Sequence, residues 1–181
     1  MPATTRLTLH ASARRVANLV WLEERTFEAL GALARVESEP AAKLLLARHA
    51  RHHAWHARVL REWLPQTHDL DAAALVGPAA PALDEVFAEV TAARDPDQTL
   101  ERLAGVYRGL IPAAVDGYHS LIEECSQVAD GALLRWLRVI VVDEDRDRAE
   151  AEELLGSLDR GRVEERAGEV TSRLAAAGGI A

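Results

Sequence analysis

Four histidines lie within the stretch RHARHHAWHARVL, residues 48–60. They are His49, His52, His53 and His56. Imidazole nitrogens bind transition-metal ions and exchange protons near neutral pH. This density of histidines therefore indicates either metal binding or acid–base chemistry, provided that the side chains face the interior of the protein.

The apolar residues of the same segment define the face that is expected to be buried. They are Leu45, Val59, Leu60 and Trp63, which share one face of a helix expected over 40–64. His49, His52 and His56 continue this face, whereas His53 falls to its side. We therefore expect three of the four imidazoles to point into the core.

Carboxylates interrupt the apolar faces of two other expected helices. Glu23 lies near the centre of such a face in the first helix, and Glu144 and Asp147 lie on that of the fourth. Burying an unpaired carboxylate costs several kcal/mol. About 15 residues separate Glu23 from the turn that follows it, and about 14 separate that turn from His52, so both are expected at one level of the bundle. The sequence therefore predicts one buried layer of carboxylates and imidazoles.

Four long helices are expected to position these groups. They run over about 8–37, 40–64, 97–127 and from the break at 130–131 to about 155, followed by a tail helix over about 162–175. The connection over 65–98 is rich in proline and carries one short helix. Pro112 predicts a kink in the third helix. Tyr107 and Tyr118 lie on the inner face of that helix, which has no carboxylate, and Arg148 lies at the edge of the fourth.

Composition sets the class of protein. A chain of 181 residues rich in Ala, Leu, Arg and Glu predicts a single all-α domain over 1–181. The net charge of −8 argues against nucleic acid as a partner.

The single cysteine, Cys125, excludes a disulfide within the chain and a cysteine-cluster metal site. Lys43 is the only lysine, as expected of a GC-rich bacterial genome. No apolar run approaches the roughly 20 residues that span a bilayer, and the N-terminal stretch lacks the apolar core of a signal peptide, so we expect a cytoplasmic protein without a membrane partner.

The helices and their buried ligands resemble the ferritin-like superfamily of dimetal carboxylate proteins over about residues 8–156. That family carries a Glu on the first helix, Glu-x-x-His on the second, Glu on the third and Glu-x-x-His on the fourth. Glu23 matches the first position. On the second helix, the stretch HARH places His49 where the family has Glu and His52 where the family has His. On the fourth helix, the stretch EDRD keeps Glu144 but has Asp147 in place of the family's His. The third helix offers no match.

The resemblance implies a ferritin-like four-helix bundle with a long crossover, and two function hypotheses follow. The first is a metal-dependent oxidase or oxygenase that acts on a small molecule, with iron as the expected metal and manganese or zinc as alternatives. Its ligands would be Glu23, His49, His52, His56, Glu144 and Asp147, and its pocket would include Tyr107, Tyr118 and Arg148. The second is a metal-free scaffold that binds a small ligand or partner, or performs acid–base chemistry through the buried His–carboxylate network. A homodimer is compatible with either hypothesis.

Overall fold

The computed structural model describes residues 7–92, 95 and 98–180, and this part of the chain is predominantly helical. Its elements, in order, are α1 (Leu9–Val36), α2 (Pro40–Glu62), β1 (Gln66–Thr67), β2 (Leu70–Asp71), η1 (Ala73–Leu75), α3 (Leu83–Val90), α4 (Thr99–Ala104), η2 (Gly105–Leu110), α5 (Ile111–Glu124), α6 (Gly131–Leu155) and α7 (Arg160–Ala176). The helical class predicted from the sequence is confirmed. The short antiparallel pair of β1 and β2, at the start of the long connection, was not predicted.

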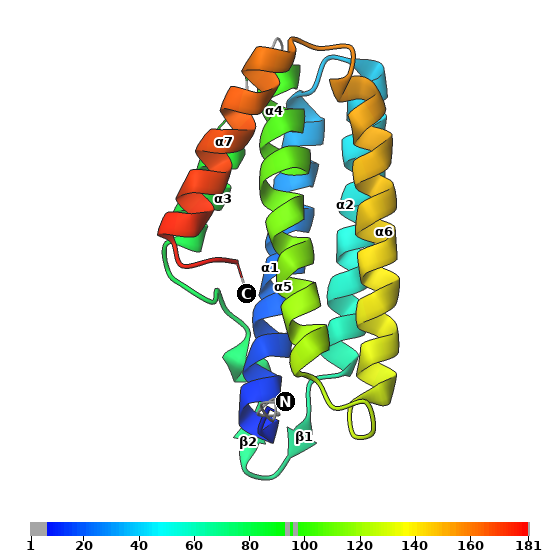
Figure 1. Ribbon diagram of the computed structural model, residues 1–181, viewed down its shortest axis with the longest axis vertical. Coiled ribbons are helices and arrows are strands. Elements are labelled where there is room, and N and C mark those ends of the chain that lie inside the picture. Colours follow the sequence, from blue (N-terminus) through cyan, green and yellow to red (C-terminus); the bar gives the residue numbers. More distant parts are fainter. Residues whose placement is uncertain (1–6, 93–94, 96–97, 181) are drawn as a thin grey trace, which may run out of the picture.

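The long helices form a bundle with one long crossover. Figure 1 shows α1 and α2 as an antiparallel pair, after which the chain returns along the bundle to α4. The run α4–η2–α5 then descends in the same direction as α2, and α6 ascends beside it. α7 packs outside this core against α3, α4 and η2. The bundle therefore places α1, α2, α5 and α6 around one interior.

Local signals at the helix ends agree with this arrangement. The Thr8 hydroxyl accepts a hydrogen bond from the Ala11 amide at the start of α1, and Pro40 occupies the first turn of α2. The turn between these helices is tied to α4 by a fully buried ion pair, in which Arg102 Nε lies 2.7 Å from Glu37 Oε2. This contact fixes the end of the α1–α2 pair against the third helical segment.

The third helical segment contains a wide turn that was not predicted. Pro112 has no amide hydrogen and its ring crowds the carbonyl one turn earlier, and we therefore expected a kink there. The structure instead has the π-helical segment η2 directly before it, in which the Ile111 amide bonds to the Val106 carbonyl five residues back. Tyr107 in η2 and Tyr118 in α5 are both buried, as the sequence predicted.

The crossover and α7 cover the outer sides of the bundle. Trp21 of α1 packs edge-to-face on Phe87 of α3 with 5.6 Å between ring centroids. α7 approaches η2 closely because Gly109 has no side chain: a Cβ there would lie 2.7 Å from Val170 Cγ1. In the part of the chain that the structure describes, every helix is too short or too polar to cross a membrane.

Candidate metal centre

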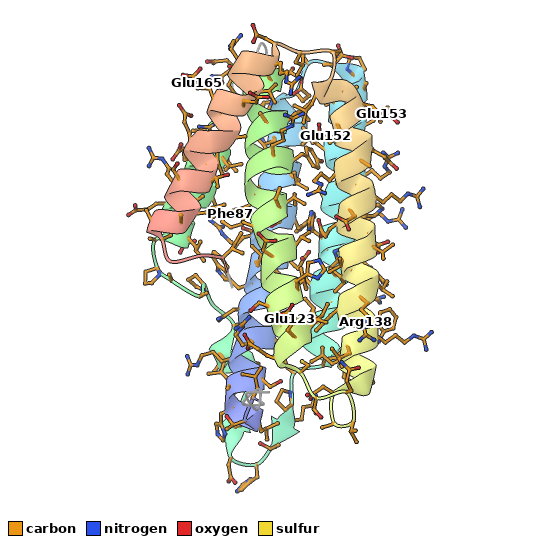
Figure 2. All side chains as sticks on the ribbon, in the orientation of Figure 1. Phe87, Glu123, Arg138, Glu152, Glu153 and Glu165 are labelled. Atoms are coloured by element: carbon orange, nitrogen blue, oxygen red, sulfur yellow. The ribbon has the colours of Figure 1, made fainter. Side chains whose placement is uncertain are left out.

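Side chains from α1, α2 and α6 meet in the interior of the bundle. They are Glu23 from α1, His53 and His56 from α2, and Glu144 from α6. Each is at most 2% exposed, and each offers one donor atom within 4.8 Å of the other three. Charged side chains on the outer faces, such as Arg138 and Glu153, project away from the bundle (Figure 2). The buried group of Glu23, His53, His56 and Glu144, hereafter the Glu/His cluster, is therefore separated from the solvated charges.

Four nitrogen–oxygen distances within the Glu/His cluster can be compared with the spacing between ligands of one metal ion. His56 Nδ1 lies 3.3 Å from Glu23 Oε2 and 3.3 Å from Glu144 Oε1. His53 Nδ1 lies 3.3 Å from Glu144 Oε1 and 2.7 Å from Glu23 Oε2. A tetrahedral ion with bonds of about 2.0–2.2 Å needs its ligands about 3.3–3.6 Å apart. Three of these four distances already match that spacing.

The shortest distance in the Glu/His cluster is a hydrogen bond rather than a ligand spacing. Glu23 Oε2 and His53 Nδ1 are 2.7 Å apart and share a proton. An ion bound between them would replace that proton, and the two atoms would move apart by a fraction of an ångström. Exchange of this proton for a cation would therefore require only a small displacement of the two side chains.

Some polar atoms of the Glu/His cluster have no hydrogen bond. Within the described residues, both carboxylate oxygens of Glu144 and Nδ1 of His56 are buried without a hydrogen-bond partner. The 3.3 Å approach of His56 Nδ1 to Glu144 brings the groups within Coulombic reach but lacks hydrogen-bond geometry. An unsatisfied buried polar group costs about 1–3 kcal/mol, and more if it is charged. A cation between these atoms would satisfy them together.

The pKa values show how the cluster is held without a cation. Burial by itself opposes charge on each group, but the mutual attraction of carboxylates and imidazoles outweighs it. His53 and His56 hold the pKa of Glu23 far below its ordinary value. Glu144 and Glu23 raise the pKa of His53, and raise that of His56 to about 10. A proton on His56 therefore supplies positive charge that a divalent ion would otherwise bring, and the raised pKa of His53 acts in the same direction.

Tyr118 orients Glu23 from the third helical segment. Its hydroxyl donates to Glu23 Oε1 over 2.5 Å, while Oε2 of the same carboxylate faces the histidines. Burial, and then the charge of Glu23, raise the pKa of Tyr118 well above its ordinary value, so the phenol keeps its proton and remains a donor. One oxygen of Glu23 is thus anchored and the other is directed at the cluster.

A second polar group lies about one helical turn away. Tyr107 OH is 2.7 Å from His49 Nδ1, and Asp147 lies between the two remaining histidines, with Oδ1 3.3 Å from His49 Nε2 and Oδ2 2.7 Å from His52 Nδ1. Burial, and next the charge of Arg48, lower the pKa of His49 to about 3, so its ring is neutral. This second group reaches the protein surface at His52, whose side chain is 39% exposed.

The structure therefore divides the predicted ligands into two sets. Glu23, His56 and Glu144 lie in the Glu/His cluster as expected, whereas His49, His52 and Asp147 form the neighbouring group.

Two orientations were predicted wrongly. His53, expected at the edge of the buried face, is 2% exposed and takes the place that we assigned to His52. Arg148, expected near the pocket, has a side chain that is 40% exposed and lies 3.6 Å from Asp145 on the surface. The buried residues Leu46, His49, His53, His56 and Leu60 alternate three and four positions apart, which is the seam of a packed helix pair. That longer alternation was the available signal for His53.

Comparison of the chain with protein-family models, with curated proteins and with solved structures gave no match. A buried group of two carboxylates and two imidazoles in a helical bundle could hold a metal ion.

Proposed function

We propose that this protein is a metal-binding bundle of the ferritin-like type that takes one divalent transition-metal ion in the Glu/His cluster. The observation that carries the proposal is the position of Glu144. Its carboxylate is buried, has no hydrogen bond from the residues that the structure describes, and lies 3.3 Å from the Nδ1 atoms of both His53 and His56. The up–down–down–up order of α1, α2, α5 and α6, with its long crossover, supports the ferritin-like part of the proposal.

The donor set favours a particular range of metals. Two carboxylates and two neutral imidazoles balance the charge of a divalent ion, and nitrogen–oxygen sets of this kind suit iron, manganese and zinc. The single cysteine, Cys125, lies outside the cluster, so no soft thiolate ligand is offered. Iron is the metal that we expect first, with manganese and zinc as alternatives.

We further propose that the bound metal serves oxidation of a small molecule. Iron or manganese held by these four residues would supply redox or Lewis-acid chemistry. The chain's own residues would hold the metal in place: Tyr118 fixes Glu23, and helix packing keeps bulk water from the cluster. Oxygen consumption after addition of ferrous iron to the metal-free protein tests this part. Consumption no faster than in a His53→Ala variant would contradict it.

The metal-binding proposal is tested by element analysis of protein purified without chelator, and by equilibrium dialysis of the metal-free protein against iron, manganese and zinc. We expect about one ion per chain, and loss of binding in Glu144→Ala. His119→Ala is the matched control, since His119 lies on the exposed side of α5. A protein that contains no metal and takes up none of the three ions would refute the proposal.

One observation favours a second candidate, a metal-free His–carboxylate network that performs acid–base chemistry or binds a ligand. Both oxygens of Glu23 are already hydrogen-bonded, one to His53 and one to Tyr118. Hydrogen bonds alone therefore satisfy Glu23, one of the two carboxylates of the cluster, without a metal ion. In this case His53→Ala would change ligand binding or proton transfer while metal content stays at zero in every variant.

A further inference from the structure

We propose that Asp143, which lies on the outer side of the Glu/His cluster, is a positioning residue that fixes the orientation and tautomer of His56 for metal binding. The inference rests on the proposed metal site and extends it by one residue that neither the ligand spacing nor the sequence motif includes. Its basis is the way in which the two nitrogens of the His56 ring are used.

The two ring nitrogens of His56 face different partners. Nε2 lies 3.4 Å from Asp143 Oδ2 in a long hydrogen bond. Nδ1 has no hydrogen bond within the described residues and lies 3.3 Å from both Glu23 and Glu144. A carboxylate can only accept, so Nε2 must carry the hydrogen of this bond. Once a cation replaces the proton on Nδ1, the ring keeps its hydrogen on Nε2 and presents the Nδ1 lone pair to the interior, which is the tautomer that a cation among the four donors requires.

The helix geometry allows α6 to act on the ring from both sides. Asp143 and Glu144 are neighbours in sequence and therefore point about 100° apart around the helix. Glu144 is 1% exposed and faces the cluster, whereas the Asp143 side chain is 37% exposed at the boundary with solvent. One turn of α6 thus supplies a ligand on the inner side of His56 and a hydrogen-bond acceptor on its outer side.

Aromatic packing restricts the same ring. The Trp55 ring lies 5.4 Å from that of His56, and Trp136 of α6 packs edge-to-face on Trp55 at 5.9 Å. With these ring contacts and with carboxylates at both nitrogens, a 180° rotation of the ring, which exchanges Nδ1 with Cδ2 and Nε2 with Cε1, would have to break the bond to Asp143. Metal-bound histidines commonly donate their second N–H to a carboxylate in this way, and loss of that acceptor weakens metal binding about 10–100-fold.

The test combines zinc affinity with nitrogen NMR of His56 in the full-length protein. Affinity is measured by competition with a chromophoric chelator for the wild type, Asp143→Ala, Asp143→Asn and Asp145→Asn. We expect about 10–100-fold weaker zinc binding in Asp143→Ala, and a smaller loss in Asp143→Asn, whose amide oxygen can still accept the Nε2 hydrogen. Asp145→Asn is the matched charge control, because Asp145 is an exposed neighbour on the same turn that faces Arg148.

The NMR measurement separates positioning from general attraction of the ion. In the zinc-bound wild type we expect His56 to carry its hydrogen on Nε2, and in Asp143→Ala we expect that signal to weaken as a second ring state becomes populated.

Zinc affinity and a His56 tautomer that are both unchanged in Asp143→Ala would overturn the role of Asp143 while leaving the metal site intact. An equal loss of affinity in Asp145→Asn would overturn it in favour of net charge. If the wild type binds no zinc, iron or manganese, the metal proposal and this inference fail together. Should Asp143→Ala not fold, the near-isosteric Asp143→Asn decides by the same two measurements.

Discussion

His56 Nδ1 and Glu144 Oε1 lie 3.3 Å apart in the interior of the bundle, and neither atom makes a hydrogen bond within the described residues. They come from α2 and α6, which are separated in sequence by the whole crossover and the third helical segment. A packed helical bundle gains nothing from leaving such atoms without partners. The relation is explained if the site is built to exchange its protons for a cation.

Replacement of two neighbouring histidines should change metal affinity to very different extents. His53→Ala removes a buried donor of the Glu/His cluster, and we expect metal affinity to fall about 100-fold or more, beyond the usual loss for a supporting residue. His52→Ala removes a part-exposed side chain that contacts Asp147, and affinity should stay within about threefold of the wild type. Equilibrium dialysis against zinc checks both variants. Loss of binding only in His52→Ala would restore the ligand set that the sequence predicted.

Metal binding should strengthen as pH rises. In the metal-free protein the pKa of His56 is raised to about 10, so this ring carries a proton at neutral pH that a cation must displace, and the raised pKa of His53 adds to that competition. Each displaced proton makes the affinity rise about tenfold per pH unit below the pKa of the group. Zinc affinity measured at three pH values between 6.5 and 8.5 should therefore increase steadily, with proton release in weakly buffered solution. An affinity independent of pH would show that the imidazoles are already unprotonated.

The metal-free protein should be most stable at mildly acidic to neutral pH. The pKa of Glu23 is lowered from 4.5, so its contribution to stability is present above that value and is lost as pH falls below it. The pKa of His56 is raised from 6.5 to about 10, so its contribution is complete below 6.5 and is lost as pH rises towards 10. Urea unfolding across this range should show stability decreasing on both sides. In Glu23→Gln the acid side of the profile should flatten, and an unchanged profile would contradict the assignment.

Removing the hydroxyl of Tyr118 should destabilise the bundle and leave the fold intact. Tyr118→Phe deprives Glu23 of a buried donor, at a cost of about 1–3 kcal/mol in the free energy of unfolding. Zinc affinity should also fall, because Glu23 is no longer held in one orientation. Tyr107→Phe is the control for binding: its hydroxyl contacts His49 outside the cluster, and its affinity for zinc should be close to that of the wild type.

The contact between η2 and α7 should tolerate no side chain at position 109. A Cβ there would lie 2.7 Å from Val170 Cγ1, so Gly109→Ala must push α7 outward, at a cost of about 1–3 kcal/mol. Gly31→Ala, at an open position within α1, should instead stabilise the protein by about 0.5–1 kcal/mol through helix propensity. Thermal or urea unfolding of both variants checks the pair. Equal effects of the two substitutions would contradict the close approach of α7.

Most of the helical framework could be predicted from the sequence, because capping residues, prolines and apolar spacing act locally. The prediction extended to Glu23 and Glu144, since a single carboxylate within an apolar stripe stands out. It extended equally to Tyr118, on the inner face of the third helical segment. The π-helical turn η2 could not be predicted, because proline indicates a disturbance in the helix but does not determine which hydrogen bonds replace the lost one.

The choice between His52 and His53 could not be made from the spacing that we used. Relative to the direction shared by His49 and His56, one points about 50° to one side and the other about 50° to the opposite side. The small residues Ala50 and Ala57, both 4% exposed, lie on the side of His53. That side packs closely against α1, so His53 is buried and His52 reaches the boundary. The deciding factor was the position of a neighbouring helix rather than a property of α2 itself.

The Glu/His cluster has a consequence for folding as well as for chemistry. It draws its side chains from the first, second and last long helices of the bundle, in a chain whose single cysteine allows no internal disulfide. An ion bound there would cross-link these distant segments and close the long crossover into a loop, as a disulfide does in oxidising compartments. Unlike a disulfide, this cross-link could be removed by a chelator and restored by adding metal. The stability of the bundle against unfolding would then depend on the concentration of metal ions around it.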